Sequence, residues 1–158
     1  SASTTVGLPP TAWARAAVQF PTATHASGSA AVEGIGAFAT DGGPAVCRIT
    51  PHSERVFRSG VILAVEIPWT LTQLVEATQD VVRASGLDSC YIRPIVYTGY
   101  GEMGLNPLPC SVDVSIAIWP WGHYLGEEAL EHGTKLKTSS WQRHDPKAIP
   151  HTCQATGM

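Results

Sequence analysis

Alternating apolar and polar positions along the chain predict several short β-strands. Successive side chains in a strand point to opposite faces, so a period of two marks a strand with one buried face. Runs of β-branched residues strengthen this interpretation, because such side chains pack well on a pleated sheet. We expect strands at Ala14–Phe20, Ile35–Ala39, Ala45–Ile49, Tyr91–Tyr97, Val112–Trp119 and Lys135–Ser139.

Helices are predicted between these strands. The first runs from about His52 to Leu63. The second begins after Thr70, a residue type that caps helix N-termini, and ends at Gly86, a residue type common at helix C-termini. A short third helix is expected over Glu127–Glu131. The second helix has an apolar face formed by Leu71, Leu74, Val75, Val81 and Val82.

The order of these elements predicts an α+β fold. Strands occur with two to three helices among them but without regular β-α-β alternation, which favours a mostly antiparallel sheet packed against helices. A chain of 158 residues is long enough for one domain with a single core. We expect a flexible N-terminal segment over residues 1–12 and a single domain over residues 13–158.

Composition and charge exclude several classes of function. The net charge is −3 and no Lys/Arg run exists, so we expect no nucleic-acid partner and no membrane partner. The N-terminus has neither a basic nor an apolar signal region, and no apolar stretch is long enough to span a bilayer, which predicts a cytoplasmic protein. The four cysteines are scattered singly, which indicates neither a zinc site nor a disulfide framework: Cys47, Cys90, Cys110 and Cys153.

Five segments carry motifs of one known family. Residues 90–94 read Cys-Tyr-Ile-Arg-Pro, and residues 119–126 read Trp-Pro-Trp-Gly-His-Tyr-Leu-Gly. Further motifs stand at residues 32–35 (Val-Glu-Gly-Ile), 52–55 (His-Ser-Glu-Arg) and 99–107 (Gly-Tyr-Gly-Glu-Met-Gly-Leu-Asn-Pro). Together they closely resemble the N-terminal half of a branched-chain amino acid aminotransferase, a class IV, fold type IV, pyridoxal-phosphate enzyme. The resemblance covers residues 13–157 approximately and implies the same α+β domain.

The resemblance implies roles for several residues. Tyr91 and Arg93 correspond to side chains that bind substrate carboxylates. Trp121 and Tyr124 correspond to side chains that line the substrate pocket, and Arg55 corresponds to the arginine that binds the cofactor phosphate. A charged Arg93 on an otherwise apolar strand independently indicates a pocket, since burying an unpaired charge is costly.

Three further residues are candidates near the same site. Glu33 lies in the motif near the floor of the active site, and Trp141 adds aromatic surface for a substrate pocket. His123 lies between Trp121 and Tyr124 and is a candidate acid–base group, since its ordinary pKa is about 6.5. Trp141 and His123 also have structural alternatives, which for Trp141 is core packing.

The departures from the family pattern decide the expected chemistry. The Ile149-Pro150 turn leads to Gln154, where the family has the lysine that carries the cofactor. A carboxamide is not nucleophilic and cannot form a Schiff base. Gly36 stands where the family has an arginine, and the family's second domain is absent from this chain. We therefore expect no pyridoxal phosphate, no other cofactor, no metal and no transamination.

Two function hypotheses remain open. The first is a cofactor-independent enzyme, with catalytic candidates Tyr91, Arg93, His123, Tyr124 and Gln154, acting on an apolar small molecule by cyclisation, isomerisation or addition in a secondary-metabolite pathway. The second is a non-catalytic protein that binds a ligand or caps a full-length aminotransferase. A decaying gene product is a third, less attractive alternative. In either main hypothesis we expect a homodimer that covers the surface left by the missing domain.

Overall fold

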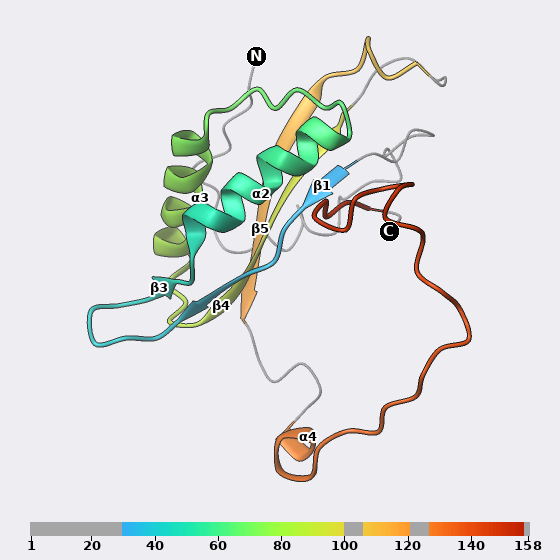
Figure 1. Ribbon diagram of the computed structural model, residues 1–158. Coiled ribbons are helices and arrows are strands. Elements are labelled where there is room, and N and C mark those ends of the chain that lie inside the picture. The colour runs from blue at the N-terminus through green and yellow to red at the C-terminus, as the bar shows by residue number, and fades with distance from the viewer. Residues whose placement is uncertain (1–29, 100–105, 121–126, 157–158) are drawn as a thin grey trace.

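A single antiparallel sheet forms the centre of the structure (Figure 1). The computed structural model describes residues 30–99, 106–120 and 127–156. Within them the central strand β4 (Cys90–Thr98) pairs with β5 (Val112–Pro120) along one side. On its other side β4 pairs with two short strands in succession, β1 (Ala30–Val32) and β2 (Ile35–Phe38). The short strand β3 (Ala45–Val46) extends the sheet beyond β2.

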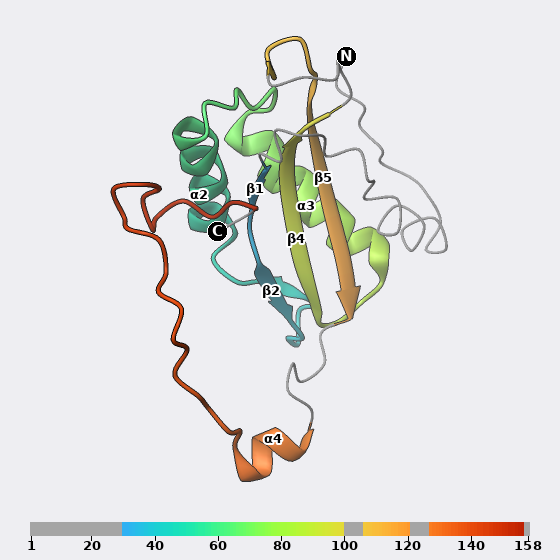
Figure 2. The same ribbon diagram turned by 90° about the vertical axis from the view of Figure 1, so that its right-hand side faces the viewer.

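Two helices cover one face of this sheet (Figure 2). Helix α2 (Ile49–Ile62) packs on β1, and helix α3 (Leu71–Ser85) packs on β4 and β5. Alternate residues of β4, from Cys90 to Thr98, are buried beneath the helices, and the residues between them are less buried. The buried core consequently lies between the helices and this face of the sheet, and it includes Ala31, Ile35, Val56, Leu74, Val82, Ile92 and Val96.

Helix α3 has well-formed ends. The Thr70 hydroxyl accepts a hydrogen bond from the Gln73 N–H, and the Gln73 side chain accepts one from the Thr70 N–H, which completes a capping box. Gly86 ends the helix with φ 66°, in the left-handed region that glycine adopts without strain. Local capping chemistry therefore sets the ends of this helix.

The C-terminal segment, residues 153–156, lies alongside β1. Ala155 forms an antiparallel bridge with Ala31. The Val32 N–H donates to the Gln154 carbonyl at 3.0 Å, and the Thr156 N–H donates to the Ala30 carbonyl at 2.9 Å. These bonds satisfy backbone groups on the side of β1 that faces away from β4.

A long exposed segment, which we call the arm (residues 133–143), separates this C-terminal segment from the short helix α4 (Glu127–His132). Every residue of the arm is exposed, and Leu136 and Trp141 are 92% and 89% exposed. Figure 1 shows the chain running from α4 back to β1 away from the sheet and the two large helices. The arm has apolar side chains but buries none of them.

The structure confirms the predicted fold class and most of the elements. The predicted strand at Lys135–Ser139 is wrong, because these residues lie in the arm and pair with no strand of the described chain. The strand predicted at Ala45–Ile49 ends at Val46, and Ile49 instead begins α2. The strand predicted at Ala14–Phe20 lies outside the described residues. None of the helices in the described part of the chain is long and apolar enough to cross a membrane.

Candidate functional site

A fully buried carboxylate, Glu33, stands in the break between β1 and β2 and organises one group of polar side chains. Arg55 on α2 donates from Nε to Glu33 Oε2 at 2.5 Å and from Nη2 to Glu33 Oε1. The Gly34 N–H donates to Oε1 at 2.8 Å, and His52 Nδ1 lies 3.4 Å from the same oxygen. This bidentate pairing satisfies both carboxylate oxygens of Glu33.

The same contacts decide the protonation of Glu33. Burial alone would raise the pKa of Glu33, but hydrogen bonds from Arg55 and Gly34, together with the charge of Arg55, outweigh burial and lower it. The hydrogen bond to Glu33 in turn raises the pKa of Arg55. The two side chains are therefore a charged pair in the folded protein.

Gln154 joins this cluster from the C-terminal segment. Its side-chain carbonyl accepts a hydrogen bond of 2.5 Å from Arg55 Nη2. Its backbone N–H donates to the Ser59 hydroxyl on α2 at 3.0 Å. The neighbouring Cys153 is only 3% exposed. Gln154 thus anchors the C-terminal segment to α2 and occupies one of the donors that Arg55 could otherwise offer to an anion.

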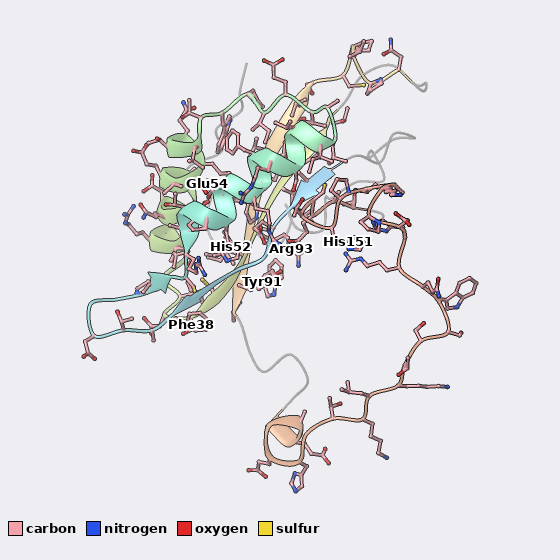
Figure 3. All side chains as sticks on the ribbon, in the orientation of Figure 1. Phe38, His52, Glu54, Tyr91, Arg93 and His151 are labelled. Atoms are coloured by element: carbon pink, nitrogen blue, oxygen red, sulfur yellow. The ribbon has the colours of Figure 1, made fainter. Side chains whose placement is uncertain are left out.

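A second group of side chains lies on the face of the sheet opposite the helices. Arg93 Nη2 donates to the Tyr91 hydroxyl at 2.5 Å, and the Arg93 guanidinium carbon lies 5.0 Å from the centroid of the Tyr91 ring. The Tyr91 ring centroid is 4.8 Å from that of Trp119 on β5. A Cβ atom at position 34 would overlap the Tyr91 hydroxyl oxygen, so only glycine there admits this hydroxyl. Figure 3 shows Tyr91 and Arg93 beside one another.

The two arginines differ in their charge balance. Arg55 is paired with Glu33, but among the described residues no carboxylate lies within 4.0 Å of Arg93. Arg93 is only partly exposed, and its Nε atom is buried without an acceptor in the described part of the chain. A partly buried cation with an unused donor is costly unless an anion pairs with it. Arg93 is therefore the better candidate for binding an anionic ligand.

The structure brings some of the predicted site residues together and separates others. Tyr91 and Arg93 are in contact, and Glu33, Arg55 and Gln154 form one cluster. Trp141, predicted to line the substrate pocket, is on the arm and is 89% exposed. Three predicted residues lie outside the described residues: Trp121, His123 and Tyr124.

Sequence reasoning missed His52 as a member of the Glu33 cluster. His52 stands three positions before Arg55 on α2, and residues three apart share a helix face. That spacing could have identified it. Among the described residues no group of three or more His, Cys, Asp or Glu side chains could hold a metal ion.

Similarity to known proteins covers most of the chain. No family model matches the sequence. The branched-chain-amino-acid aminotransferase of Pseudomonas aeruginosa is 42% identical over 132 residues, which are 84% of this chain but 43% of that protein. The Escherichia coli K12 enzyme of the same name is 41% identical over 131 residues, with 82% and 42% covered. The chain thus spans less than half the length of these relatives.

Solved structures of branched-chain aminotransferases are also similar to this chain. A crystal structure of the Escherichia coli branched-chain amino acid aminotransferase matches with a TM-score of 0.78 at 41% identity, covering 84% of this chain and 44% of that one. The enzyme of Thermoproteus uzoniensis with norvaline matches with a TM-score of 0.70 at 30% identity, covering 82% of this chain and 43% of that one. A structure of the T.th. enzyme with 4-methylvaleric acid covers 60% of this chain and 32% of that one, at 41% identity and a TM-score of 0.55.

Proposed function

Because this chain is homologous to the N-terminal domain of branched-chain amino acid aminotransferases, we propose that it binds a small organic carboxylate non-covalently, at Arg93 and Tyr91. The observation that carries this proposal is the partly buried guanidinium of Arg93, which has no carboxylate partner in the described chain. A ligand carboxylate would supply the missing negative charge beside the guanidinium. A related enzyme has been solved with 4-methylvaleric acid, an apolar carboxylic acid of this kind.

The residues of this chain do not fit a covalently held pyridoxal cofactor. The resemblance places Gln154 where a Schiff-base lysine is required, and a carboxamide cannot supply the amine. Arg55, the implied phosphate ligand, already has its charge balanced by Glu33 and donates to Gln154 from the same Nη2 atom. The proposed function therefore includes no chemistry through pyridoxal phosphate.

Ligand binding at Arg93 is common to both function hypotheses. For an enzyme it would be the first step of the reaction, and for a binding protein it would be the entire function. An arginine and a tyrosine hydroxyl aimed at one anion can stabilise charge that develops during a reaction, which keeps the cofactor-independent enzyme as our leading form of the proposal. The acid–base candidate for that reaction is His123. Measuring turnover by a His123→Gln variant would test this role. Capping of a full-length aminotransferase is the second candidate, and the exposed Leu136 and Trp141 of the arm favour it.

The proposal is tested by titration calorimetry with 4-methylvalerate and its neutral analogue 4-methylvaleramide. We expect the acid to bind and the amide to bind at least about tenfold more weakly, since a charge-assisted hydrogen bond contributes about 1.5–3 kcal/mol. Arg93→Gln should weaken binding of the acid by a similar factor. Arg83→Gln, which changes an exposed arginine on α3, is the matched control and should bind like the wild type.

Two results would contradict the proposal. Equal affinity for the acid and the amide, or unchanged affinity in the Arg93→Gln variant, would mean that Arg93 does not hold a carboxylate. Mixing the protein with pyridoxal phosphate and recording its absorbance tests the cofactor separately. We expect no aldimine band. The appearance of one would mean that a lysine at another position in the chain binds the cofactor, because residue 154 is a glutamine.

A further inference from the structure

Three aromatic rings form a row across three strands on the sheet face that carries Arg93. Gly36 on β2 is the Cα partner of Tyr91 on β4, and Tyr91 is the Cα partner of Trp119 on β5. The Phe38 ring lies over Gly36, because a Cβ atom built at position 36 would be 2.8 Å from Phe38 Cζ. The row therefore runs Phe38, Tyr91, Trp119, and it requires glycine at position 36.

The two ends of this row are open to solvent. Phe38 is 54% exposed and Trp119 is 40% exposed, although both are large apolar side chains. The Tyr91 and Trp119 rings are already in contact at 4.8 Å, in a tilted arrangement. Exposed aromatic rings on one face of a sheet offer faces and edges on which another flat ring can stack.

Arg93 stands next to this row on the same face of β4, two residues beyond Tyr91. Its Cα partner on β5 is Ala117. Two residues along a strand span roughly 7 Å. A molecule that places a ring on the row and a carboxylate on Arg93 thus needs a short, extended linker of about two methylene groups between them.

We propose that this row selects a carboxylate that carries an aromatic or other flat conjugated ring over an aliphatic one of the same size. This inference rests on the proposed function, in which Arg93 binds the carboxylate. The open row of rings adds the second element of recognition, and Gly36 and Phe38 are its specificity-determining residues. Phe38 provides one ring, and Gly36 provides the room in which that ring lies on the sheet.

The test is calorimetry with 3-phenylpropanoate and 3-cyclohexylpropanoate, which share the carboxylate, the linker and the ring size. We expect the phenyl acid to bind roughly twofold to tenfold more tightly, the range that a favourable aromatic pair gives beyond apolar burial. The cyclohexyl acid is the more apolar of the two, so burial alone would give the opposite order. Phe38→Leu and Gly36→Ala should each bring the ratio of the affinities for the phenyl and cyclohexyl acids closer to one. Leu136→Ala on the arm should leave this ratio unchanged.

The outcomes separate this inference from the proposed function. If both acids bind with equal affinity, or the cyclohexyl acid binds more tightly, the aromatic selection is wrong and carboxylate binding at Arg93 stands. If the Phe38→Leu variant keeps the full preference, the row is not the selecting surface. If neither acid binds, both the inference and the proposed function are wrong.

Discussion

Arg55 donates a hydrogen bond of 2.5 Å to the side chain of Gln154, although 99 positions separate the two residues in the sequence. The same guanidinium holds the buried Glu33, so one side chain connects α2, the break between β1 and β2, and the C-terminal segment. In the family that this chain resembles, the corresponding arginine and lysine serve a cofactor. Here the glutamine gives the arginine a neutral partner inside the protein.

Replacing Gln154 by alanine should destabilise the fold. The change removes an acceptor from a charged donor, so we expect the free energy of unfolding to fall by about 1–2 kcal/mol. Urea denaturation followed by circular dichroism measures this. Gln142→Ala removes the same side chain from an exposed position on the arm and serves as the control. Equal stability of the two variants would show that the Arg55–Gln154 bond contributes nothing.

Replacing Glu33 by glutamine should lower the free energy of unfolding more than replacing Gln154 by alanine does. Arg55 would keep its charge and lose its counter-ion, at a cost of about 3 kcal/mol, the low end for a buried pair because the Arg55 side chain is 38% exposed. Glu54→Gln, an exposed change on the same helix, is the control and should alter stability by less than about 0.5 kcal/mol. A Glu33→Gln variant as stable as the control would rule out the ion pair as a stabilising contact.

The pH dependence of stability should carry the signature of Glu33. Its pKa is lowered in the folded state from the ordinary value of 4.5, so the folded protein favours the ionised carboxylate. The stability that this preference contributes is fully present above pH 4.5 and is lost as the pH falls through the folded pKa. The difference between wild type and Glu33→Gln in urea denaturation should therefore shrink with acid. A difference that stays constant from about pH 7 to about pH 3 would contradict this assignment.

The capping box of α3 makes a separate prediction. Thr70→Ala removes the side-chain acceptor for the Gln73 N–H and should lower the free energy of unfolding by about 1 kcal/mol. Thr72→Ala changes the same residue type at an exposed position inside the helix and should be neutral or slightly stabilising. If both variants show the same stability, the cap does not contribute.

Among the residues that the structure describes, those of the arm should be the first to be cleaved by a protease. It is extended and fully exposed, so trypsin can reach Lys135, Lys137 and Arg143 without unfolding the sheet. Cleavage after Arg83 requires α3 to open and should come later. Mass spectrometry of timed digests identifies the order. Resistance of all three arm sites would mean that another chain covers the arm, and sedimentation velocity would then test for the predicted homodimer.

Local chemistry made part of this structure predictable. Thr70 and Gly86 located the ends of α3 because a helix cap depends on residues a few positions apart. The strand expected at Lys135–Ser139 failed because alternation describes a strand's faces but not its neighbour, and no neighbour exists for it in the described chain. The contacts of Gln154 could not be predicted from the sequence either, since a hydrogen bond between residues far apart in the sequence depends on the tertiary fold.

The candidate site, like the fold, could be predicted only in part from the sequence. Motifs identified Tyr91 and Arg93, and their two-residue spacing on one strand placed them on one face. The row that includes Phe38 was not predicted, because it depends on the register between β2 and β4 and on the absence of a side chain at Gly36. Register between strands follows from tertiary pairing, which single-chain alternation does not specify.

The pairing of residues 153–156 with β1 has a consequence for synthesis on the ribosome. β1 emerges more than a hundred residues before the C-terminal segment, and its outer backbone groups find their partners only when residues 153–156 have been translated. Until then the nascent chain presents an open strand edge, which is a template for association with other chains. Expression yield should for this reason depend on chaperones that shield nascent polypeptides, even if the finished domain is stable.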